Sequence, residues 1–282
     1  MDDLSIYRSS NLLYNQEKMS RYEPGGFHPV CLGDTFKEGR YKICHKLGWG
    51  GYSTVWLAYD RVLEVWVSIK VMTADSTENS RELKALRVLQ ETAASNYIVK
   101  QLDDFMHHGP NGCHQCIVFE LLGPSVDTIV NDYRKGGDQL DPETILKITT
   151  QLLRAVSSMH AVGYVHGDIS GSNLAFTCPK LAHLPQDDIF EILGLPESED
   201  LTRVDGRPLG PGVPKQLVKR ADWDNWIDED EEDVRLIDFG EMFVQGSKPD
   251  TLAQPPDLRA PETIFTTFFD HRLDLWRAGI TV

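Results

Sequence analysis

The sequence predicts an α+β fold of two lobes, in which a small five-stranded antiparallel sheet with one helix precedes a mostly helical lobe. Two patterns predict this arrangement. Five short runs of β-branched and aromatic residues lie between residues 41 and 122, with one helical segment among them. A long amphipathic helical pattern then begins near residue 141. The composition, 41% hydrophobic and 25% charged, is that of an ordinary globular protein.

The segment before the first strand has two parts. Residues 1–21 are polar and lack periodicity, so we expect a disordered N-terminal arm. Residues 22–39 are rich in Gly and Pro, which favours an extended lead-in. We therefore expect the lead-in and small lobe over residues 22–121, and the large lobe over residues 122–282.

The small lobe is expected to combine its strands with one helix. The helix spans residues 82–89, where Leu83, Leu86 and Leu89 share one face. The strands are short apolar runs between Gly or polar turns. The expected strands are residues 41–47, 53–59, 65–71, 98–105 and 116–122.

The large lobe begins with the clearest helix of the chain. Asp141 suits the N-cap and Pro142 the first turn, and apolar residues recur at helical spacing until Gly163 ends the pattern. An irregular, Pro-rich insert follows at about residues 177–233 and ends in the acidic run 228–233. We interpret this run as a solvated loop, and a docking strip for a basic peptide is the alternative.

Charge and cysteine usage restrict the expected partners and compartment. With 28 basic and 43 acidic residues the net charge is −15, which disfavours nucleic acid and anionic membranes and favours basic partners. The N-terminus lacks a secretory pattern, and no stretch approaches the roughly 20 apolar residues that span a bilayer. Five cysteines without a signal peptide indicate reduced thiols in the cytoplasm or nucleus.

One pair of cysteines has the spacing of a metal motif. Cys113 and Cys116 form a C-x-x-C pair with three histidines nearby, which could contribute to a zinc site. No second ligand pair accompanies them in the sequence, so we favour a turn that enters a buried strand.

A glycine cluster and a lysine mark a candidate phosphate site. Gly48, Gly50 and Gly51 would let backbone N–H groups approach phosphate oxygens, although such a cluster alone is more often a hairpin turn. Lys70 lies inside an apolar strand, where a buried ammonium needs an anionic partner. A nucleotide phosphate and Glu82 on the next helix would provide partners, and snorkelling to solvent is the alternative.

Three polar residues after the long helix have spacings that suit phosphoryl transfer. Asp168 and Asn173 have an Asp-x-x-x-x-Asn spacing, in which the aspartate would accept a hydroxyl proton and the asparagine would hold a metal. Asp238 ends the apolar run 234–237 and would bind Mg²⁺ beside the phosphates. Either aspartate alone could be a turn or cap residue.

In this order, and followed by Ala260-Pro261-Glu262, these segments resemble eukaryotic protein kinases. The sequence more narrowly resembles the SR-protein kinase family in its shortened fungal form. The resemblance covers residues 22–282 and includes an insert between the Asp168 and Asp238 segments, as in the family. It rests on residues 22–30, 33–34, 39–41, 46–50, 52–58 and 119–123.

The resemblance implies a bilobal kinase fold that binds ATP and Mg²⁺. The implied hinge for adenine runs from Glu120 to Leu122. The implied catalytic residues are Asp168, Lys70 and Asn173, and the implied metal ligands are Asn173 and Asp238. The implied ATP-binding residues are Leu47, Gly48, Gly50, Gly51, Ser53, Val55, Ser68, Lys70, Glu82, Glu120, Leu122 and Ala175.

Members of the family phosphorylate serines in Arg-Ser-rich splicing factors. The resemblance therefore implies a serine/threonine kinase that acts on basic Ser/Arg-rich proteins. We also expect no direct contact with nucleic acid or membrane, a monomer, and a place in the cytoplasm and nucleus.

Departures from the family pattern leave other functions open. Ser170 stands where the family has a lysine that steadies the γ-phosphate, and Gly167 replaces the catalytic-loop arginine. The central helix of the large lobe begins at Asp274, which the resemblance implies anchors the catalytic loop. The chain stops at Val282, before the family fold is expected to be complete.

Two alternatives follow from these departures. The first is a pseudokinase or nucleotide-binding scaffold, made inactive by truncation and by Ser170. The second is a small-molecule kinase, because His166-Gly167-Asp168 also resembles the catalytic loop of that class. Against the second alternative, Ala260-Pro261-Glu262 is typical of kinases that hold a peptide.

Overall fold

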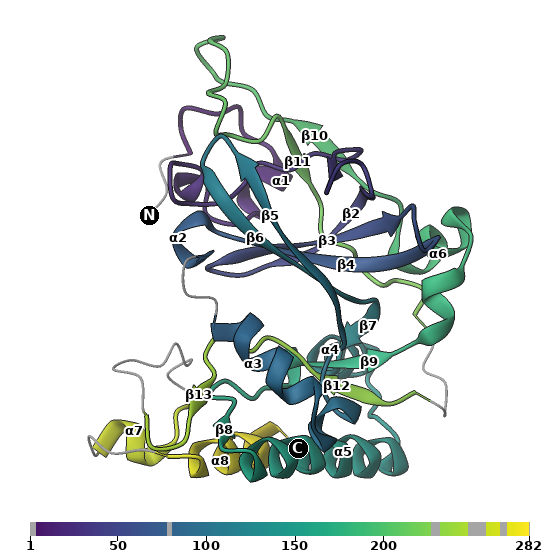
Figure 1. Cartoon of the computed structure of the whole chain (residues 1–282). Coiled ribbons are helices and arrows are strands. Elements are labelled where there is room, and N and C mark those ends of the chain that lie inside the picture. The colour runs from purple at the N-terminus through teal and green to yellow at the C-terminus, as the bar shows by residue number, and fades with distance from the viewer. Residues whose placement is uncertain (1–3, 78–80, 227–231, 248–257, 266–269, 282) are drawn as a thin grey trace. The chain divides into compact units, whose positions relative to one another are not determined.

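The computed structural model describes residues 4–77, 81–226, 232–247, 258–265 and 270–281, and it divides into two compact units (Figure 1). Unit 1 consists of residues 1–79, 102–121 and 179–226, and unit 2 of residues 80–101, 122–178 and 227–282. This division differs from the expected lobes at two places. The helix that follows residue 80 belongs to unit 2, and most of the insert belongs to unit 1.

Unit 1 is built on a six-stranded sheet in the order β1-β2-β3-β4-β6-β5 (Figure 1). The pairs β1–β2, β2–β3, β3–β4 and β4–β6 are antiparallel. The sheet has one strand more than predicted, because β1 has only two residues, too few to give a periodic pattern. The strands are β1 (Thr35–Phe36), β2 (Tyr41–Trp49), β3 (Ser53–Asp60), β4 (Val65–Met72), β5 (Gln101–Gly109) and β6 (Gly112–Glu120).

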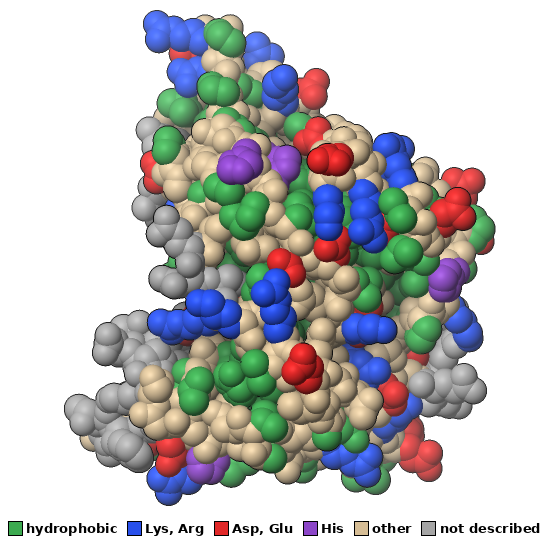
Figure 2. All heavy atoms as spheres, in the orientation of Figure 1, with side chains coloured by type: hydrophobic (Ala, Val, Ile, Leu, Met, Phe, Trp, Pro, Cys, Tyr) green, Lys and Arg blue, Asp and Glu red, His purple; other side chains and the backbone are tan. Residues whose placement is uncertain are grey.

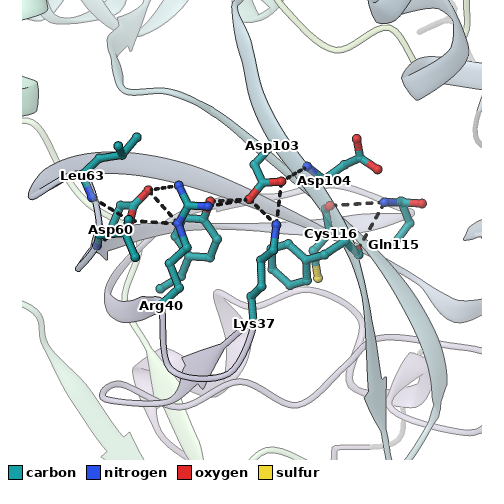
Figure 3. Close-up of polar contacts among 11 residues, drawn as sticks. Lys37, Arg40, Asp60, Leu63, Asp103, Asp104, Gln115 and Cys116 are labelled. Carbon is teal, nitrogen blue, oxygen red and sulfur yellow. Dashed lines mark hydrogen bonds and ion pairs between the residues drawn. The ribbon is translucent and has the colours of Figure 1, made fainter.

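Ion pairs fix the turn before β2 against two other strands (Figure 3). Arg40 lies 2.7 Å from Asp60 at the end of β3 and 3.3 Å from Asp103 in β5. Lys37 lies 2.6 Å from Asp103, and the Tyr41 hydroxyl donates to the same carboxylate at 2.6 Å. Because Asp60 is only 2% exposed, its pairing with Arg40 is needed to keep its charge inside the sheet.

The expected disordered arm is folded into unit 1 in its described part, residues 4–21. This part includes α1 (Asn11–Tyr14) and the 3-10 helix Met19–Arg21. Leu13 and Met19 are 2% and 5% exposed and share an apolar cluster with Leu201 and Leu217 of the insert. The prediction of disorder is therefore wrong for these residues. Their apolar partners come from a distant part of the sequence, which the composition of the arm cannot show.

A buried ion pair also holds the arm. The Nζ atom of Lys46 in β2 lies 2.5 Å from Glu17 Oε2, and both side chains are 2% exposed. The Tyr22 hydroxyl donates to the other carboxylate oxygen of Glu17, and Gln16 Oε1 accepts from Lys46. Burial lowers the pKa of Lys46, and the attraction of Glu17 opposes that shift.

The insert folds onto the strands of unit 1. The indole N–H of Trp66 donates to the carbonyl of Leu184 at 2.8 Å, and the Ala221 N–H donates to the carbonyl of Lys46 at 2.8 Å. Of the acidic run at its end, residues 228–231 lie outside the described residues. The elements of the insert are the 3-10 helix Pro179–His183, α6 (Gln186–Leu193), β10 (Ser198–Asp200) and β11 (Gln216–Val218).

Unit 2 combines helices with short strands. The three-stranded sheet has the order β12-β9-β7, and β13 pairs with β8. The long helix begins as predicted, with the Asp141 carboxylate accepting the N–H of Glu143 at 2.9 Å. The strands are β7 (Leu122–Ser125), β8 (Tyr164–Val165), β9 (Leu174–Thr177), β12 (Val234–Leu236) and β13 (Phe243–Val244). The helices are α3 (Arg81–Gln90), α4 (Val126–Gly136), α5 (Pro142–Ala161), α7 (Pro261–Phe265) and α8 (Arg272–Thr281).

The surface gives two further observations. On the face shown in Figure 2, Lys and Arg side chains lie among Asp and Glu side chains, so the described residues of that face form no patch of one sign. Among the described helices, none combines the length and the apolar character that a membrane span requires.

Candidate active site

The segment that carries Asp168 is placed by α5 and β8. Gly163 ends the helix with φ = +82°, a backbone conformation that glycine adopts without strain. β8 then pairs with β13, and the chain enters the segment 166–173 with His166 fully buried. Strand pairing before the segment and the burial of His166 within it fix the position of the backbone that leads to Asp168.

Asp274 of α8 holds the backbone of this segment, as the resemblance implied. Its Oδ2 atom accepts the N–H of His166 at 2.8 Å, and its Oδ1 atom accepts the N–H of Gly167 at 2.9 Å. Gly167 has φ = +84°, and a Cβ there would lie 2.6 Å from the carbonyl oxygen of Glu241. This turn therefore excludes the arginine that the family has at the position of Gly167.

Both oxygens of the Asp168 carboxylate accept hydrogen bonds. Arg277 Nη2 donates to Oδ1 at 2.9 Å, and Asn173 Nδ2 donates to Oδ2 at 3.1 Å and to the Asp168 carbonyl at 2.8 Å. Burial raises the pKa of Asp168 to about 6, with Asp238 and Glu241 adding to the rise and Arg277 and Asn173 opposing it. Arg277 was not among the predicted site residues.

Asp238 lies beside Asn173 because β12 pairs with β9. The ladder places Leu236 opposite Leu174, and the Ile237 N–H donates to the Asn173 carbonyl at 2.9 Å. Asp238 is exposed and has φ = +60°, whereas Phe239 after it is fully buried. The turn thus directs the chain so that the carboxylate stays in solvent while the next ring is in the core.

Phe239 anchors this turn against two other segments. Its ring packs edge-on against His166 with the centroids 5.1 Å apart, and its N–H lies 3.4 Å from Glu82 Oε1 of α3. The His166 ring contacts the Ile237 carbonyl at 3.1 Å. Unit 2 therefore brings Asp168, Asn173, Asp238 and Glu82 into one connected set.

The donor set of unit 2 suits Mg²⁺. The Asn173 amide nitrogen is engaged by Asp168, so the ligand that Asn173 can offer is its Oδ1 atom. Asp238 offers an exposed carboxylate. Mg²⁺ is commonly held by one or two protein oxygens together with phosphates, and Asn173 and Asp238 fit that role.

Unit 1 carries the predicted glycine turn and lysine. β2 and β3 form a hairpin in which the Gly50 N–H donates to the Ser53 carbonyl at 2.8 Å. A Cβ on Gly50 or Gly51 would meet no described protein atom within 4 Å, and neither residue has a positive φ. Backbone strain and crowding by the protein therefore do not explain these glycines, which leaves room for a ligand as their reason.

Lys70 is 8% exposed and lies in β4 between Val55 of β3 and Ile117 of β6. The Ser68 hydroxyl in the same strand donates to the carbonyl of Glu120 at 3.3 Å. Lys70 belongs to unit 1 and Glu82 to unit 2, so their pairing stays a prediction. So do the roles of Leu47, Ser53, Val55, Leu122 and Ala175 around a nucleotide.

The C-x-x-C pair does not belong to a metal centre in the described part of the chain. Cys116 is fully buried in β6, and no group of three or more His, Cys, Asp or Glu side chains among the described residues is placed to hold a metal. Burial raises the pKa of the Cys116 thiol. Both cysteines lie within β6 itself, so the pair is in the strand rather than in the turn that enters it.

Comparison with known proteins gives the same fold and a family. Residues 41–182 match the model of the protein kinase domain. A crystal structure of a kinase domain has a TM-score of 0.63 and covers 89% of this chain and 65% of its own. That structure is 21% identical in sequence, so its likeness concerns the fold alone.

Three curated relatives match different shares of the chain. The serine/threonine-protein kinase SKY1 of Saccharomyces cerevisiae is 36% identical over 57% of this chain and 23% of its own. SRSF protein kinase 3 of Homo sapiens is 35% identical over 56% of this chain and 29% of its own. A serine/threonine protein kinase of Aspergillus fumigatus is 30% identical over 95% of this chain and 62% of its own.

The chain thus spans less than two thirds of each of these three relatives. The kinase-domain model nevertheless matches half of it, and that half includes the glycine turn, Lys70, Asp168 and Asn173. This chain belongs to the protein kinase family.

Proposed function

We propose that this chain transfers the γ-phosphoryl group of ATP to a serine or threonine hydroxyl of a protein. One observation carries the proposal. In unit 2 the Asp168 carboxylate is bonded on both oxygens, beside Asn173 and the exposed Asp238. A carboxylate fixed next to two metal-type ligands suits a reaction in which catalysis depends on positioning and electrostatics.

The side chains have separate tasks in the proposed step. The substrate hydroxyl oxygen attacks the γ-phosphorus, the bond to the β–γ bridging oxygen breaks, and ADP leaves with that electron pair. Asp168, whose side chain is 25% exposed, orients the hydroxyl and takes its proton. The glycine turn and Lys70 of unit 1 would bind the phosphates. Mg²⁺ on Asn173 and Asp238 would supply positive charge for the phosphate oxygens.

Basic Ser/Arg-rich proteins are the proposed substrates. The net charge of −15 favours a basic partner, and one relative carries an SRSF protein kinase name. The acidic run contributes fewer available carboxylates than its sequence indicates. Asp233 Oδ1 accepts from Gln151 at 2.5 Å, and the Asp233 N–H donates to Thr177 at 3.0 Å. The rest of the run, residues 228–232, is therefore the proposed docking strip.

A nucleotide-binding scaffold is the second candidate, and Ser170 is the observation that favours it. The segment 166–173 contains neither Lys nor Arg, so no cation of its own faces a γ-phosphate. Such a protein would bind Mg²⁺-ATP without transferring phosphate. Thermal stabilisation by nucleotide combined with absent transfer would identify it.

The experiment that tests the proposed function compares wild type with Asp168→Asn. Wild type should phosphorylate an Arg-Ser repeat peptide and should leave a peptide with acidic neighbours around serine unmodified. The substitution should lower the transfer rate by about 10²- to 10⁴-fold, because the proton acceptor is lost. Mg²⁺-ATP should still raise the melting temperature of the variant. Equal transfer by both proteins would refute the role of Asp168.

A further inference from the structure

Arg277 is a buried cation inside the site of unit 2. It lies on α8 with its side chain 1% exposed. Its guanidinium donates in three directions, from Nε to the Ile169 carbonyl at 2.6 Å, from Nη1 to the Leu258 carbonyl at 3.2 Å, and from Nη2 to Asp168 Oδ1 at 2.9 Å. A buried guanidinium is stable only when its donors and charge are matched, and all three bonds serve that end.

Two of these bonds act on the same short segment. Asp168 and Ile169 are neighbours, so Arg277 fixes both a carbonyl and a side chain of the segment. Asn173 holds the second carboxylate oxygen, which leaves the Asp168 side chain little freedom to rotate. The Asp168 side chain is still 25% exposed, so a hydroxyl could approach it.

Arg277 supplies positive charge next to a segment that has no Lys or Arg of its own. Residues 166–173 include no Lys or Arg, and the acids Asp238 and Glu241 both act on Asp168 through their negative charge. Arg277 is the cation that opposes them at Asp168. It comes from another element, far along the chain, rather than from the segment itself.

Asp274 and Arg277 lie three residues apart on α8 and so share one face of the helix. Asp274 binds the N–H groups of His166 and Gly167, and Arg277 binds the next two residues. One helix face therefore holds four consecutive residues of the segment. The two side chains use opposite charges, one for backbone donors and the other for acceptors.

From this geometry we infer that Arg277 is a positioning residue for phosphoryl transfer. It fixes the Asp168 carboxylate toward the substrate hydroxyl and supplies the positive charge that the segment 166–173 lacks. The inference rests on the proposed function, because it assigns Arg277 a part in that reaction.

The test uses Arg277→Met, Arg277→Lys and, as a control on the same helix, Arg272→Met. Arg272 is 67% exposed and pairs with Asp270, so its loss should leave transfer unchanged. Arg277→Met should lower kcat for the Arg-Ser peptide by on the order of 10²-fold, because a misplaced carboxylate orients the hydroxyl poorly. KM for ATP should change less than about twofold. Arg277→Lys should recover part of kcat, since lysine keeps the positive charge but lacks the planar guanidinium that donates to several acceptors.

A double variant separates positioning from a general structural effect. If Arg277 acts through Asp168, then Arg277→Met should not reduce the residual transfer of Asp168→Asn any further. The inference would be overturned if the loss of transfer in the double variant equalled the product of the two single losses. Full kcat in Arg277→Met would also overturn it. If Arg277→Met does not fold at the assay temperature, Arg277→Lys decides, and full kcat there would likewise overturn it.

The proposed function and the inference can fail separately. If wild type binds Mg²⁺-ATP but transfers nothing, the proposed function fails. Crystal structures of wild type and Arg277→Met then test the positioning alone. An Asp168 carboxylate that keeps its orientation without the guanidinium would refute the role of Arg277, and a rotated carboxylate would support it.

Discussion

Each unit contains a buried cation paired with a carboxylate, and the two carboxylates differ in exposure. In unit 1, Lys46 and Glu17 are 2.5 Å apart and both are 2% exposed. In unit 2, Arg277 is 1% exposed, but Asp168 at 2.9 Å is 25% exposed. The first pair is sealed from solvent on both sides, whereas the second leaves its anion accessible. An exposed carboxylate can contact a substrate, so the Arg277–Asp168 pair is suited to catalysis. The sealed Lys46–Glu17 pair is suited to stabilising the fold.

The surroundings of the two cations follow the same division. The Lys46 Nζ atom lies 5.0 Å from the Trp49 ring centre and 5.5 Å from that of Trp56, and it donates to Gln16 and Glu17 of the arm. Arg277 instead bonds to carbonyls beside Asp168 and before Ala260. The Lys46 pair therefore joins the arm to the sheet, and the Arg277 pair orients one short segment.

The largest loss of stability is expected for Glu17→Gln. The amide keeps the shape of the carboxylate but leaves the Lys46 ammonium buried without an opposite charge. We expect unfolding to become easier by about 3 to 5 kcal/mol, the range for breaking a buried pair from one side. Deprotonation of Lys46 sets a ceiling of about 5 kcal/mol at pH 7. The free energy of unfolding in urea measures the loss.

Two controls accompany this prediction. Asp132→Asn removes an exposed pair with Lys135 on α4 and should change stability by less than about 0.5 kcal/mol. Glu17→Leu combined with Lys46→Met replaces both charges by apolar groups and should recover most of the loss. If Glu17→Gln were as mild as Asp132→Asn, the sealed pair would not hold the arm.

An intermediate effect is expected from a buried cluster of three histidines. In unit 1 the His28 ring lies 4.5 Å from that of His107 and 5.0 Å from that of His114. Among the described residues, His28 Nδ1 has no hydrogen-bond partner. Burial, together with the charges of His107 and His114, lowers the pKa of His28 from 6.5 to about 3.

This depressed pKa predicts acid sensitivity. The unfolded chain binds a proton at His28 near pH 6.5 and the folded chain only near pH 3, so protonation favours unfolding. The stability from neutral His28 is complete above pH 6.5 and is lost as pH falls toward 3. At pH 5.5 the loss is about 1.4 kcal/mol. Melting temperatures from pH 8 to 5 should fall less steeply in His28→Met than in the exposed control His183→Gln, and equal slopes would contradict the assignment.

The sequence predicted the parts of the fold and site whose signals are local. Strands β2 to β6 of unit 1 were found because each has β-type residues between Gly or polar turns, whereas β1, β10 and β11 were missed. Asp168, Asn173 and Asp238 could be predicted as site residues because their spacing along the chain is itself the motif, and their roles stay predictions. β9 and β12 then bring Asn173 and Asp238 together by strand pairing.

The failures have a common physical cause, which is contact between distant segments. The sequence of the arm predicted disorder because the residues that bury Leu13 and Met19 lie far away in the chain. They are Leu201 and Leu217 of the insert. Arg277 was missed because a lone arginine on a helix is usually solvated. One signal could have found it. Arg277 lies one helical turn after Asp274, which was already expected to contact the catalytic loop. Residues one turn apart share a helix face, so Arg277 could be expected to lie near Asp168.

Of the two substitutions that break a buried cation's pair, Glu17→Gln and Asp168→Asn, the second is expected to cost less stability. Arg277 keeps its bonds to the carbonyls of Ile169 and Leu258, and the new amide oxygen can still accept from Nη2. The charge is lost together with the bond from Asn173 Nδ2, because the new amide nitrogen faces that donor. The exposed quarter of the side chain lets water screen the guanidinium. We therefore expect a loss of about 1 kcal/mol in the same urea experiment, although transfer falls by orders of magnitude. A loss as large as that of Glu17→Gln would mean that the Arg277 pair serves the fold as much as the Lys46 pair does, and exposure of the anion would then not separate function from stability.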